Sequence, residues 1–278
     1  MSDNKRNISV SIILPTYNRA GLLPRAIDSV MRQSYKDWEL IIVDDASTDE
    51  TPEIIKKWAE TDYRITVITN VVNQYPDLPK NLNKGLAIAK GKYIARLDDD
   101  DYWIDSQKLE KQVDFLEKNK EYVIVGTGMI VIDEKGEELY RYLKNREDVD
   151  IRKKALFANP FSHTTVLFRA DAARLVGGYS NWDFAEDWDL WLKLGRKGKF
   201  YNVPEYSTAY LSAGQNNSYK YQRRQAQTIL KFITVHRKEY PYFYFAFMLN
   251  VGQLIFSLFP EGIRRNLHNF LSSIKRKI

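Results

Sequence analysis

The first half of the chain alternates short apolar runs with segments whose apolar residues recur at helical spacing. The apolar runs have the length of β-strands and cover residues 10–14, 39–43, 65–69 and 93–97. The segments between them predict helices over 22–33, 51–59, 80–90 and 106–119, with Thr51 as the cap of the second and Gly91 as the end of the third. Strands that alternate with helices in this way favour a parallel sheet with helices on both faces.

The second half has a different pattern. Runs at 123–125, 129–132 and 138–142 predict antiparallel strands with a turn at 133–136, and a further strand is expected at 164–168. A helix is predicted over 187–196 with its tryptophans facing inward, and a long helix begins after Tyr219 and runs towards Arg237. Because no low-complexity linker separates the halves, we expect them to share one compact body.

The end of the chain is apolar and then basic. Residues 242–259 lie between two prolines and carry no formal charge. A helix of this length reaches about 27 Å, which is borderline for spanning a bilayer. Beyond it, apolar residues from Ile263 to Ile278 share one helical face, with basic residues such as Arg264 and Lys275 around it. This pattern favours an interfacial anchor on an anionic membrane over a spanning helix, with core packing or a dimer interface as the alternatives.

The amino-acid composition excludes several kinds of functional site. A chain of 278 residues, 44% apolar and 28% charged, can bury a full globular core. The absence of cysteine excludes disulfides, thiolate zinc sites and cysteine nucleophiles, and the three histidines lie too far apart in sequence for a histidine-rich metal cluster. The polar N-terminus lacks the apolar core of a signal peptide, so a cytoplasmic location is expected. The net charge of +6 suggests an anionic partner, either a membrane or a nucleic acid.

Four consecutive aspartates, Asp98 to Asp101, follow the predicted strand at 93–97. Two like charges about 4 Å apart repel by about 4 kcal/mol at an effective dielectric constant near 20, so a fold that gathers several carboxylates needs a compensating cation. Oxygen ligands of this kind suit Mg2+, Mn2+ or Ca2+. The alternative for such a run alone is a solvated acidic turn.

Polar clusters follow three of the predicted parallel strands. Residues 15–18 follow the first strand, Asp44 and Asp45 follow the second, and the aspartate run follows the fourth. Ligands of open parallel sheets bind beyond the carboxyl ends of the strands. The three clusters therefore predict one active site at this edge of the sheet.

Five motifs, in this order, resemble those of the family 2 glycosyltransferases of the GT-A fold. They are the strand and Pro-Thr-Tyr-Asn-Arg at 10–19, Val-Asp-Asp-Ala-Ser-Thr-Asp at 43–49, the aspartate-rich segment at 95–101, Gly-Gly-Tyr at 177–179, and Glu-Asp-Trp-Asp-Leu-Trp at 186–191. The resemblance covers roughly residues 8–215. It implies an α/β GT-A fold: a Rossmann-like, mainly parallel central sheet flanked by helices, a smaller antiparallel acceptor-side part and a helical C-terminal tail.

The resemblance also implies a division of the chain. Residues 1–215 would form the catalytic domain, with the nucleotide-sugar half over about 1–120 and the acceptor half over about 121–215. Residues 216–278 would form a helical, aromatic and basic tail that associates with the membrane. The implied activity is the transfer of a sugar from a nucleotide diphosphate sugar to a glycan or a lipid-linked glycan.

Residue roles follow from the same resemblance. Asp45 would accept the N3–H of uracil or thymine, Asp98 would face the ribose or a metal-bound water, and Asp100 would bind Mn2+ or Mg2+ directly. Asp187 would be the general base, with Glu186 beside it, if partial burial raises the pKa of Asp187 towards neutrality. Without the resemblance, this acidic pair would be the first turn of a helix, favoured by the helix dipole. The remaining expected contacts to the nucleotide sugar come from Pro15, Thr16, Tyr17, Asn18, Arg19 and Asp44.

Two departures from the family pattern bear on the reaction. Residues 210–216 lack the arginine or histidine that often grips the diphosphate. The Gln-X-X-Arg-Trp motif of processive synthases is also missing at 222–226, which favours the addition of a single sugar.

Rival functions fit less well. A sugar nucleotidyltransferase should carry a glycine-rich phosphate loop after its first strand, and residues 15–19 are not such a loop. A catalytically inactive, membrane-associated binding protein would not need Asp98, Asp100 and Asp187. RNA binding rests on charge and tyrosines alone, so no nucleic-acid partner is expected.

Overall fold

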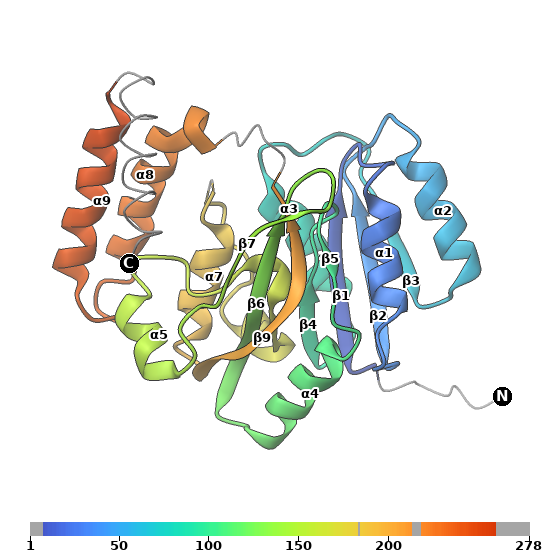
Figure 1. Cartoon of the computed structure of the whole chain (residues 1–278), viewed down its shortest axis with the longest axis horizontal. Coiled ribbons are helices and arrows are strands. Elements are labelled where there is room, and N and C mark those ends of the chain that lie inside the picture. The colour runs from blue at the N-terminus through green and yellow to red at the C-terminus, as the bar shows by residue number, and fades with distance from the viewer. Residues whose placement is uncertain (1–7, 183, 213–217, 260–278) are drawn as a thin grey trace.

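The protein is built on one nine-stranded sheet (Figure 1). The computed structural model describes residues 8–182, 184–212 and 218–259. The strand order is β3 (Ile65–Thr69), β2 (Trp38–Asp44), β1 (Val10–Thr16), β4 (Tyr93–Arg96), β8 (Leu167–Arg169), β6 (Tyr122–Ile132), β9 (Lys199–Leu211) and β5 (Tyr102–Trp103), with β7 (Glu138–Tyr142) paired to β6. The four strands from β3 to β4 are parallel, as the sequence predicts.

Both faces of the sheet are buried, because alternate residues of each central strand enter different cores. Ile12 and Leu14 pack with α1 (Leu23–Met31), α2 (Thr51–Thr61) and α4 (Lys108–Lys118). Ile13 packs on the opposite face, whose helices are α3 (Leu78–Ile88), α5 (Asp148–Lys154), α6 (Ala170–Leu175), α7 (Glu186–Leu194) and α8 (Ser218–Val235). A period of two in burial is what a strand covered on both sides produces.

Antiparallel pairing begins where β8 joins β4, with Ala95 opposite Leu167. The predicted strands at 123–125 and 129–132 are a single strand, β6, so the break between them was wrong, whereas the predicted antiparallel pairing of 129–132 with 138–142 is confirmed. Gly126 and Gly128 mark close packing rather than a break, since a Cβ atom at Gly126 would collide with Asn202 and Phe161. Strand β9, which pairs in parallel with β6, was missed because polar residues and Pro204 interrupt its apolar and aromatic residues.

Three local predictions also need correction. Thr51 lies inside α2 and does not cap it: its N–H donates to Asp49 Oδ1 at 3.0 Å, while its hydroxyl accepts the N–H of Arg19. Helix α3 spans Leu78–Ile88 and ends before Gly91, which packs against the backbone of Ser11. The predicted strand at 164–168 divides into a short helix, η1 (His163–Thr165), and β8.

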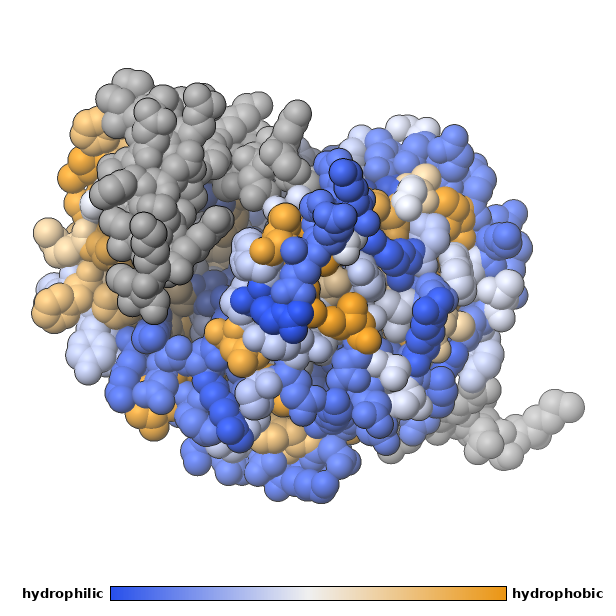
Figure 2. All heavy atoms as spheres, viewed as in Figure 1, coloured by the Kyte–Doolittle hydropathy of each residue, from blue (hydrophilic) through white to orange (hydrophobic). Residues whose placement is uncertain are grey.

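The C-terminal helices α8 and α9 (Phe243–Ser257) lie side by side at the left of Figure 1. Phe232 and Ile233 of α8 are fully buried in the same core as α7, and Ala246 of α9 joins them. Part of the predicted tail therefore packs as core. The opposite side of α9 is exposed and apolar, and Figure 2 shows this surface at the upper left. Its most exposed residues are Tyr244, Phe245 and Met248.

Within the described ranges, no helix combines the length and the apolar character needed to cross a bilayer. The basic segment predicted at 263–278 lies outside the described residues.

Candidate active site

The aspartate run lies at the carboxyl end of β4, where the nucleotide and acceptor halves meet. Asp101 is fully buried, and its Oδ1 accepts the N–H of Leu211, at the end of β9, at 3.1 Å. Burial, and then the charges of Asp98 and Asp100, raises the pKa of Asp101 well above its usual value. Asp101 therefore joins two distant strand ends.

Asp98 contacts a cation that the sequence analysis overlooked. Arg96 Nη2 lies 2.5 Å from Asp98 Oδ1, and the Arg96 side chain is fully buried. The same guanidinium group donates to the carbonyl oxygens of Ile13 and Leu97. A buried charge is tolerated when it is paired and hydrogen-bonded, so Arg96 fixes one oxygen of Asp98 at the strand end.

Asp99 and Asp100 face the loop after β1. Arg19 Nε lies 3.5 Å from Asp99 Oδ1, and the N–H of Tyr17 is directed at Asp99 Oδ2 at 3.4 Å. Burial, followed by the charge of Asp100, raises the pKa of Asp99 to about 6. The pKa of Asp100 is also raised, by burial and then by Asp98. Burial and the neighbouring carboxylates therefore outweigh the charge of Arg19 at both groups.

Loops from β1 and β2 form the adjoining wall. Pro15 and Thr16 are the buried last residues of β1, and the side chain of Asn18 exchanges hydrogen bonds with Thr48. Asp44 Oδ1 accepts the N–H of Ser47 at 3.1 Å, which shapes the turn after β2. The predicted nucleotide-binding residues are thus gathered on one side of the aspartate run.

Asp45 is buried and already accepts hydrogen bonds within the protein. Its Oδ1 accepts the Asn70 side-chain amide at 2.6 Å, and both oxygens receive the N–H of Gln74, at 2.9 and 3.0 Å. Asn70 is held in turn by Asn81 and Lys84 of α3. Asp45 therefore anchors the loop that follows β3, a role that the sequence analysis did not include.

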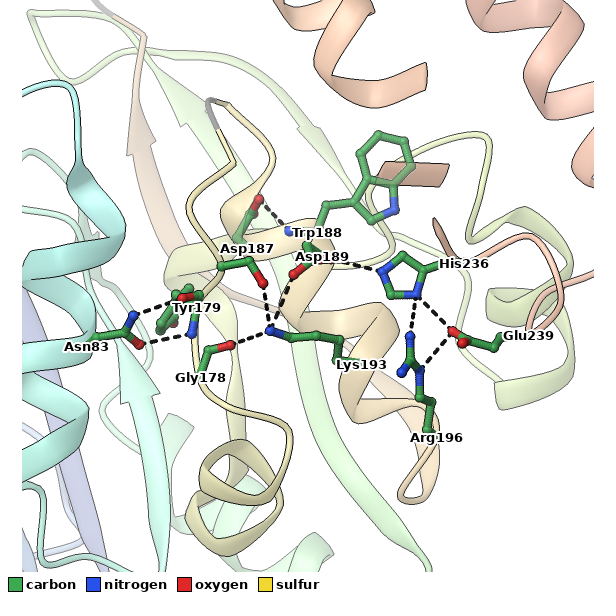
Figure 3. Close-up of polar contacts among 11 residues, drawn as sticks. Asn83, Gly178, Tyr179, Asp187, Trp188, Asp189, Lys193, Arg196, His236 and Glu239 are labelled. Atoms are coloured by element: carbon green, nitrogen blue, oxygen red, sulfur yellow. Dashed lines mark hydrogen bonds and ion pairs between the residues drawn. The ribbon is translucent and has the colours of Figure 1, made fainter. Parts of the chain in front are cut away.

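Glu186 and Asp187 begin helix α7. Asp187 Oδ1 accepts the N–H of Trp188 at 2.6 Å, and Oδ2 accepts the side-chain amide of Asn159 at 2.7 Å (Figure 3 shows the contact with Trp188). Burial raises the pKa of Asp187, and burial followed by the charge of Asp187 raises that of Glu186 to about 8. The direction agrees with the sequence-based expectation for a general base.

Asn159 and Lys144 surround this base and were missed by the sequence analysis. Lys144 Nζ donates to the Asn159 carbonyl oxygen at 2.7 Å, and the charge of Lys144 lowers the pKa of Asp187 against the effect of burial. Both residues lie in loops without a recognisable motif. Nothing in their sequence context signals that the fold brings them to α7.

The two acidic groups belong to one site. The charge of Asp98 raises the pKa values of both Glu186 and Asp187, so the end of β4 and the start of α7 interact electrostatically. His163 is a partly exposed residue whose Nε2 lies 3.0 Å from the Tyr179 hydroxyl, and desolvation of its ring, followed by the charge of Arg96, lowers its pKa well below the usual value.

Backbone strain also gathers around this site. Among the described residues other than glycine, four have a positive φ angle, and Asn18, Ala46 and Phe184 belong to the loops that carry the candidate residues. A left-handed conformation costs energy for such residues and persists where the surrounding contacts hold it, often at functional sites.

Comparison with known proteins identifies the chain's relatives. EpsE of Bacillus subtilis, which is provisionally named a glycosyltransferase, is 43% identical over 201 residues, covering 70% of each protein. The Escherichia coli enzyme WfaP, named as a UDP-Glc:α-D-GlcNAc-diphosphoundecaprenol β-1,3-glucosyltransferase, is 32% identical over 262 residues, covering 92% of this chain and 98% of WfaP.

Solved structures share the fold at low sequence identity. The mannosyltransferase PcManGT of Pyrobaculum calidifontis, solved with GDP-Man and Mn2+, superposes with a TM-score of 0.64 at 19% identity over 95% of this chain and 79% of that one. S. aureus TarS 1–349 with UDP gives a TM-score of 0.62 at 17% identity over 88% and 69%. The expected GT-A fold is confirmed.

The family model described as Glycosyl transferase family 2 matches residues 11–176, more than half of the chain. Together with the identity to EpsE and WfaP, this match confirms the resemblance drawn from the five motifs. The chain belongs to glycosyl transferase family 2 and is a glycosyltransferase.

Proposed function

We propose that this enzyme transfers one sugar from a UDP- or dTDP-sugar to a hydroxyl of a glycan or lipid-linked glycan in bacterial polysaccharide synthesis, with inversion of the anomeric centre. The observation that carries the proposal is that the aspartate run lies near enough to the acidic start of α7 for the charge of Asp98 to add to the effect of burial, the larger cause, in raising the pKa values of Glu186 and Asp187. The aspartate run, where a diphosphate would bind, and Asp187, a carboxylate with a raised pKa, thus belong to one proposed site.

The acceptor side uses Asp187. Its carboxylate takes the proton of the acceptor hydroxyl as that oxygen bonds to the anomeric carbon and the bond to the diphosphate breaks, releasing a nucleoside diphosphate. Attack from the opposite face converts an α-linked donor into a β-linked product. A base with a raised pKa suits proton abstraction near neutral pH. The β-1,3 linkage in the name of WfaP supports the same outcome.

The donor side uses Asp45, Asp98 and the loop at 15–19. Among the described residues, Asp45 Oδ2 accepts one hydrogen bond, from the N–H of Gln74, which leaves a lone pair for a single ring N–H such as N3–H of uracil or thymine. UDP-Glc in the name of WfaP and UDP bound to TarS support a uridine donor. Arg19, half exposed and 3.5 Å from Asp99 Oδ1, supplies a positive charge at the aspartate run for the diphosphate.

A divalent cation, Mn2+ or Mg2+, fits this donor set. No group of three or more acidic or histidine side chains among the described residues is arranged to hold a metal alone. Mg2+ usually takes one or two carboxylates together with substrate phosphates, which matches a site completed by the donor. Asp98 and Asp100 would hold the ion, whose charge would offset the repulsion among the neighbouring carboxylates. When bound, the ion supplies Lewis-acid stabilisation of the diphosphate.

The proposed lipid-linked acceptor and the apolar face of α9 favour activity at the cytoplasmic surface of a membrane. WfaP is named for a lipid diphosphate acceptor. The exposed residues Tyr244, Phe245 and Met248 provide an apolar surface without charge, which suits insertion at a lipid interface. The anionic lipid would be matched by the net charge of +6.

A donor screen tests the proposal. The protein is incubated with Mn2+, an alkyl-diphosphate-linked GlcNAc as acceptor, and UDP-Glc, UDP-GlcNAc, a dTDP-sugar or GDP-Man in turn, and the products are analysed by mass spectrometry and NMR. We expect one β-linked sugar from a UDP or dTDP donor, and no transfer in EDTA. An α-linked product would refute inversion, and transfer from GDP-Man alone would refute the role of Asp45.

A further inference from the structure

A buried polar network holds helix α7 from two sides (Figure 3). His236, just after α8, is fully buried, with Nε2 2.9 Å from Asp189 Oδ1 and Nδ1 2.8 Å from Glu239 Oε2. The side chain of Asp189 is 3% exposed. Burying such groups costs free energy unless each is paired, so these contacts define one arrangement of both elements.

Asp189 stands in the first turn of α7, two residues after Asp187. Burial opposes its ionisation, but hydrogen bonds from His236 and Ser180 and the charge of Lys193 outweigh burial and lower its pKa. The contact with His236 is therefore made by a carboxylate, and charge-assisted hydrogen bonds are the stronger kind.

The second side of the network reaches the nucleotide half. Lys193 Nζ lies 3.4 Å from Asp189 Oδ2 and donates to the Gly178 carbonyl oxygen at 2.6 Å. The next residue, Tyr179, exchanges two backbone hydrogen bonds with the side chain of Asn83 on α3, at 2.8 and 2.9 Å. A continuous chain of contacts thus runs from α8 through α7 to α3.

The ring of His236 can keep its contact with Asp189 in either charge state. Arg196 Nη2 lies 3.2 Å from Nδ1 and pairs through Nε with Glu239 at 2.8 Å. A neutral ring accepts from Arg196 at Nδ1, whereas a charged ring donates there to Glu239. In both cases Nε2–H donates to Asp189.

A cavity of about 420 Å³ adjoins this network, lined among others by Ser180, Trp182 and Arg196. Of the polar residues that line it, Lys193 and His236 are engaged with protein groups. Among the described residues, Asp189 Oδ2 has the ion pair with Lys193 at 3.4 Å and accepts no hydrogen bond, while Oδ1 is held by His236. The contacts in place therefore fix the position of α7 beside this cavity.

We propose that His236 is a positioning residue for sugar transfer: through Asp189 it holds α7 so that Asp187 meets the acceptor hydroxyl. This inference rests on the proposed function and adds α8 to the catalytic arrangement. Helix α7 has only nine residues, so a shift at Asp189 is transmitted to Asp187. A misplacement of about 1 Å can lower a rate by about a hundredfold.

A matched pair of polar substitutions tests the contact. The amide of His236→Gln can reach the position of Nε2 and donate to Asp189, whereas the shorter amide of His236→Asn mimics Nδ1 and cannot. We expect His236→Gln to retain most of the wild-type kcat and His236→Asn to lose at least about tenfold, with similar dissociation constants for UDP in Mn2+. Thr234→Val, which removes a hydrogen bond to Leu230 within α8, is the control and should keep its kcat.

The outcomes are distinguishable. If the wild type is active and the two His236 variants have equal kcat values, the positioning role of His236 is overturned and the proposed function stands. Absence of transfer by the wild type in the donor screen would overturn the proposed function and this inference with it. If His236→Asn does not fold, Asp189→Asn replaces it, since it keeps the shape and removes the charge. A lower kcat with unchanged UDP binding supports the proposal, and an unchanged kcat overturns it.

Discussion

Replacing Asp187 by Asn removes the proposed proton acceptor while keeping the shape of the side chain. The carboxylate accepts hydrogen bonds from Trp188 N–H and from Asn159 Nδ2. The amide of Asp187→Asn can accept only one of them, because its nitrogen faces a donor on the other side. The change therefore tests chemistry at a nearly constant structure.

The structure gives the expected losses in folding stability and in turnover. Losing the contact with Asn159 costs about 1 kcal/mol, or up to about 3 kcal/mol if that donor stays unsatisfied. Burial disfavours the charged form of Asp187, as its raised pKa indicates, so removing that charge offsets part of this cost. General-base catalysis contributes about 10²–10⁴-fold, equivalent to about 3–5 kcal/mol of activation free energy. The loss in activation free energy should thus exceed the loss in the free energy of unfolding.

The assay measures kcat with saturating donor and acceptor, the dissociation constant of UDP in Mn2+, and the melting temperature. Asp150→Asn, the same change at an exposed carboxylate of α5, is the control and should leave all three unchanged. If Asp187→Asn keeps wild-type turnover, or if it loses UDP binding instead, Asp187 is not the base.

Further changes probe the metal, a buried lysine, the C-terminal core and the apolar face. Asp100→Ala and, for the wild type, EDTA should abolish transfer and weaken UDP binding; full activity in EDTA would contradict metal dependence. Burial lowers the pKa of Lys108 to about 7 from 10.5, so the unfolded chain binds this proton more tightly and wild-type stability rises with pH between these values. Lys108→Met should therefore raise the melting temperature more at about pH 6 than at about pH 10, and an equal gain at both would refute the shift. Phe232→Ala should cost about 3–5 kcal/mol in urea unfolding, because Phe232 is fully buried; a loss below about 1 kcal/mol would make α8 a detachable tail. Phe245→Ser with Met248→Ser should reduce co-sedimentation with anionic vesicles at an unchanged melting temperature, and undiminished binding would remove this face of α9 from the membrane proposal.

The parallel half of the fold was predictable because its strands are continuous apolar runs and its helices are amphipathic. The second half was harder to predict. The sequence analysis divided β6 into two strands on either side of 126–128, but Gly126 allows Asn202 and Phe161 to approach this strand, and Gly128 allows Leu143 and Tyr206 to do so. That information belongs to residues distant in sequence, which a local pattern does not contain.

The residues of the candidate site likewise fall into those that the sequence predicts and those that only the fold identifies. Asp98, Asp100 and Asp187 stand in motifs, and the structure brings their segments together. Arg96, Asn159 and Lys144 act on them through a buried ion pair and side-chain contacts that depend on the fold. Their roles follow only once the end of β4 and the loops around α7 are known.

The pairing of β4 with β8 has a consequence for synthesis on the ribosome. When only the nucleotide half has emerged, β4 is an open sheet edge, because its partner at Leu167 has not been made. Asp101 likewise lacks the N–H of Leu211 until nearly the whole catalytic domain has been translated. Open edges promote association between chains, and pairings between distant segments form slowly. The nascent nucleotide half is thus a stage at which chaperones would engage this chain, and a fragment ending near residue 120 would aggregate rather than bind a donor.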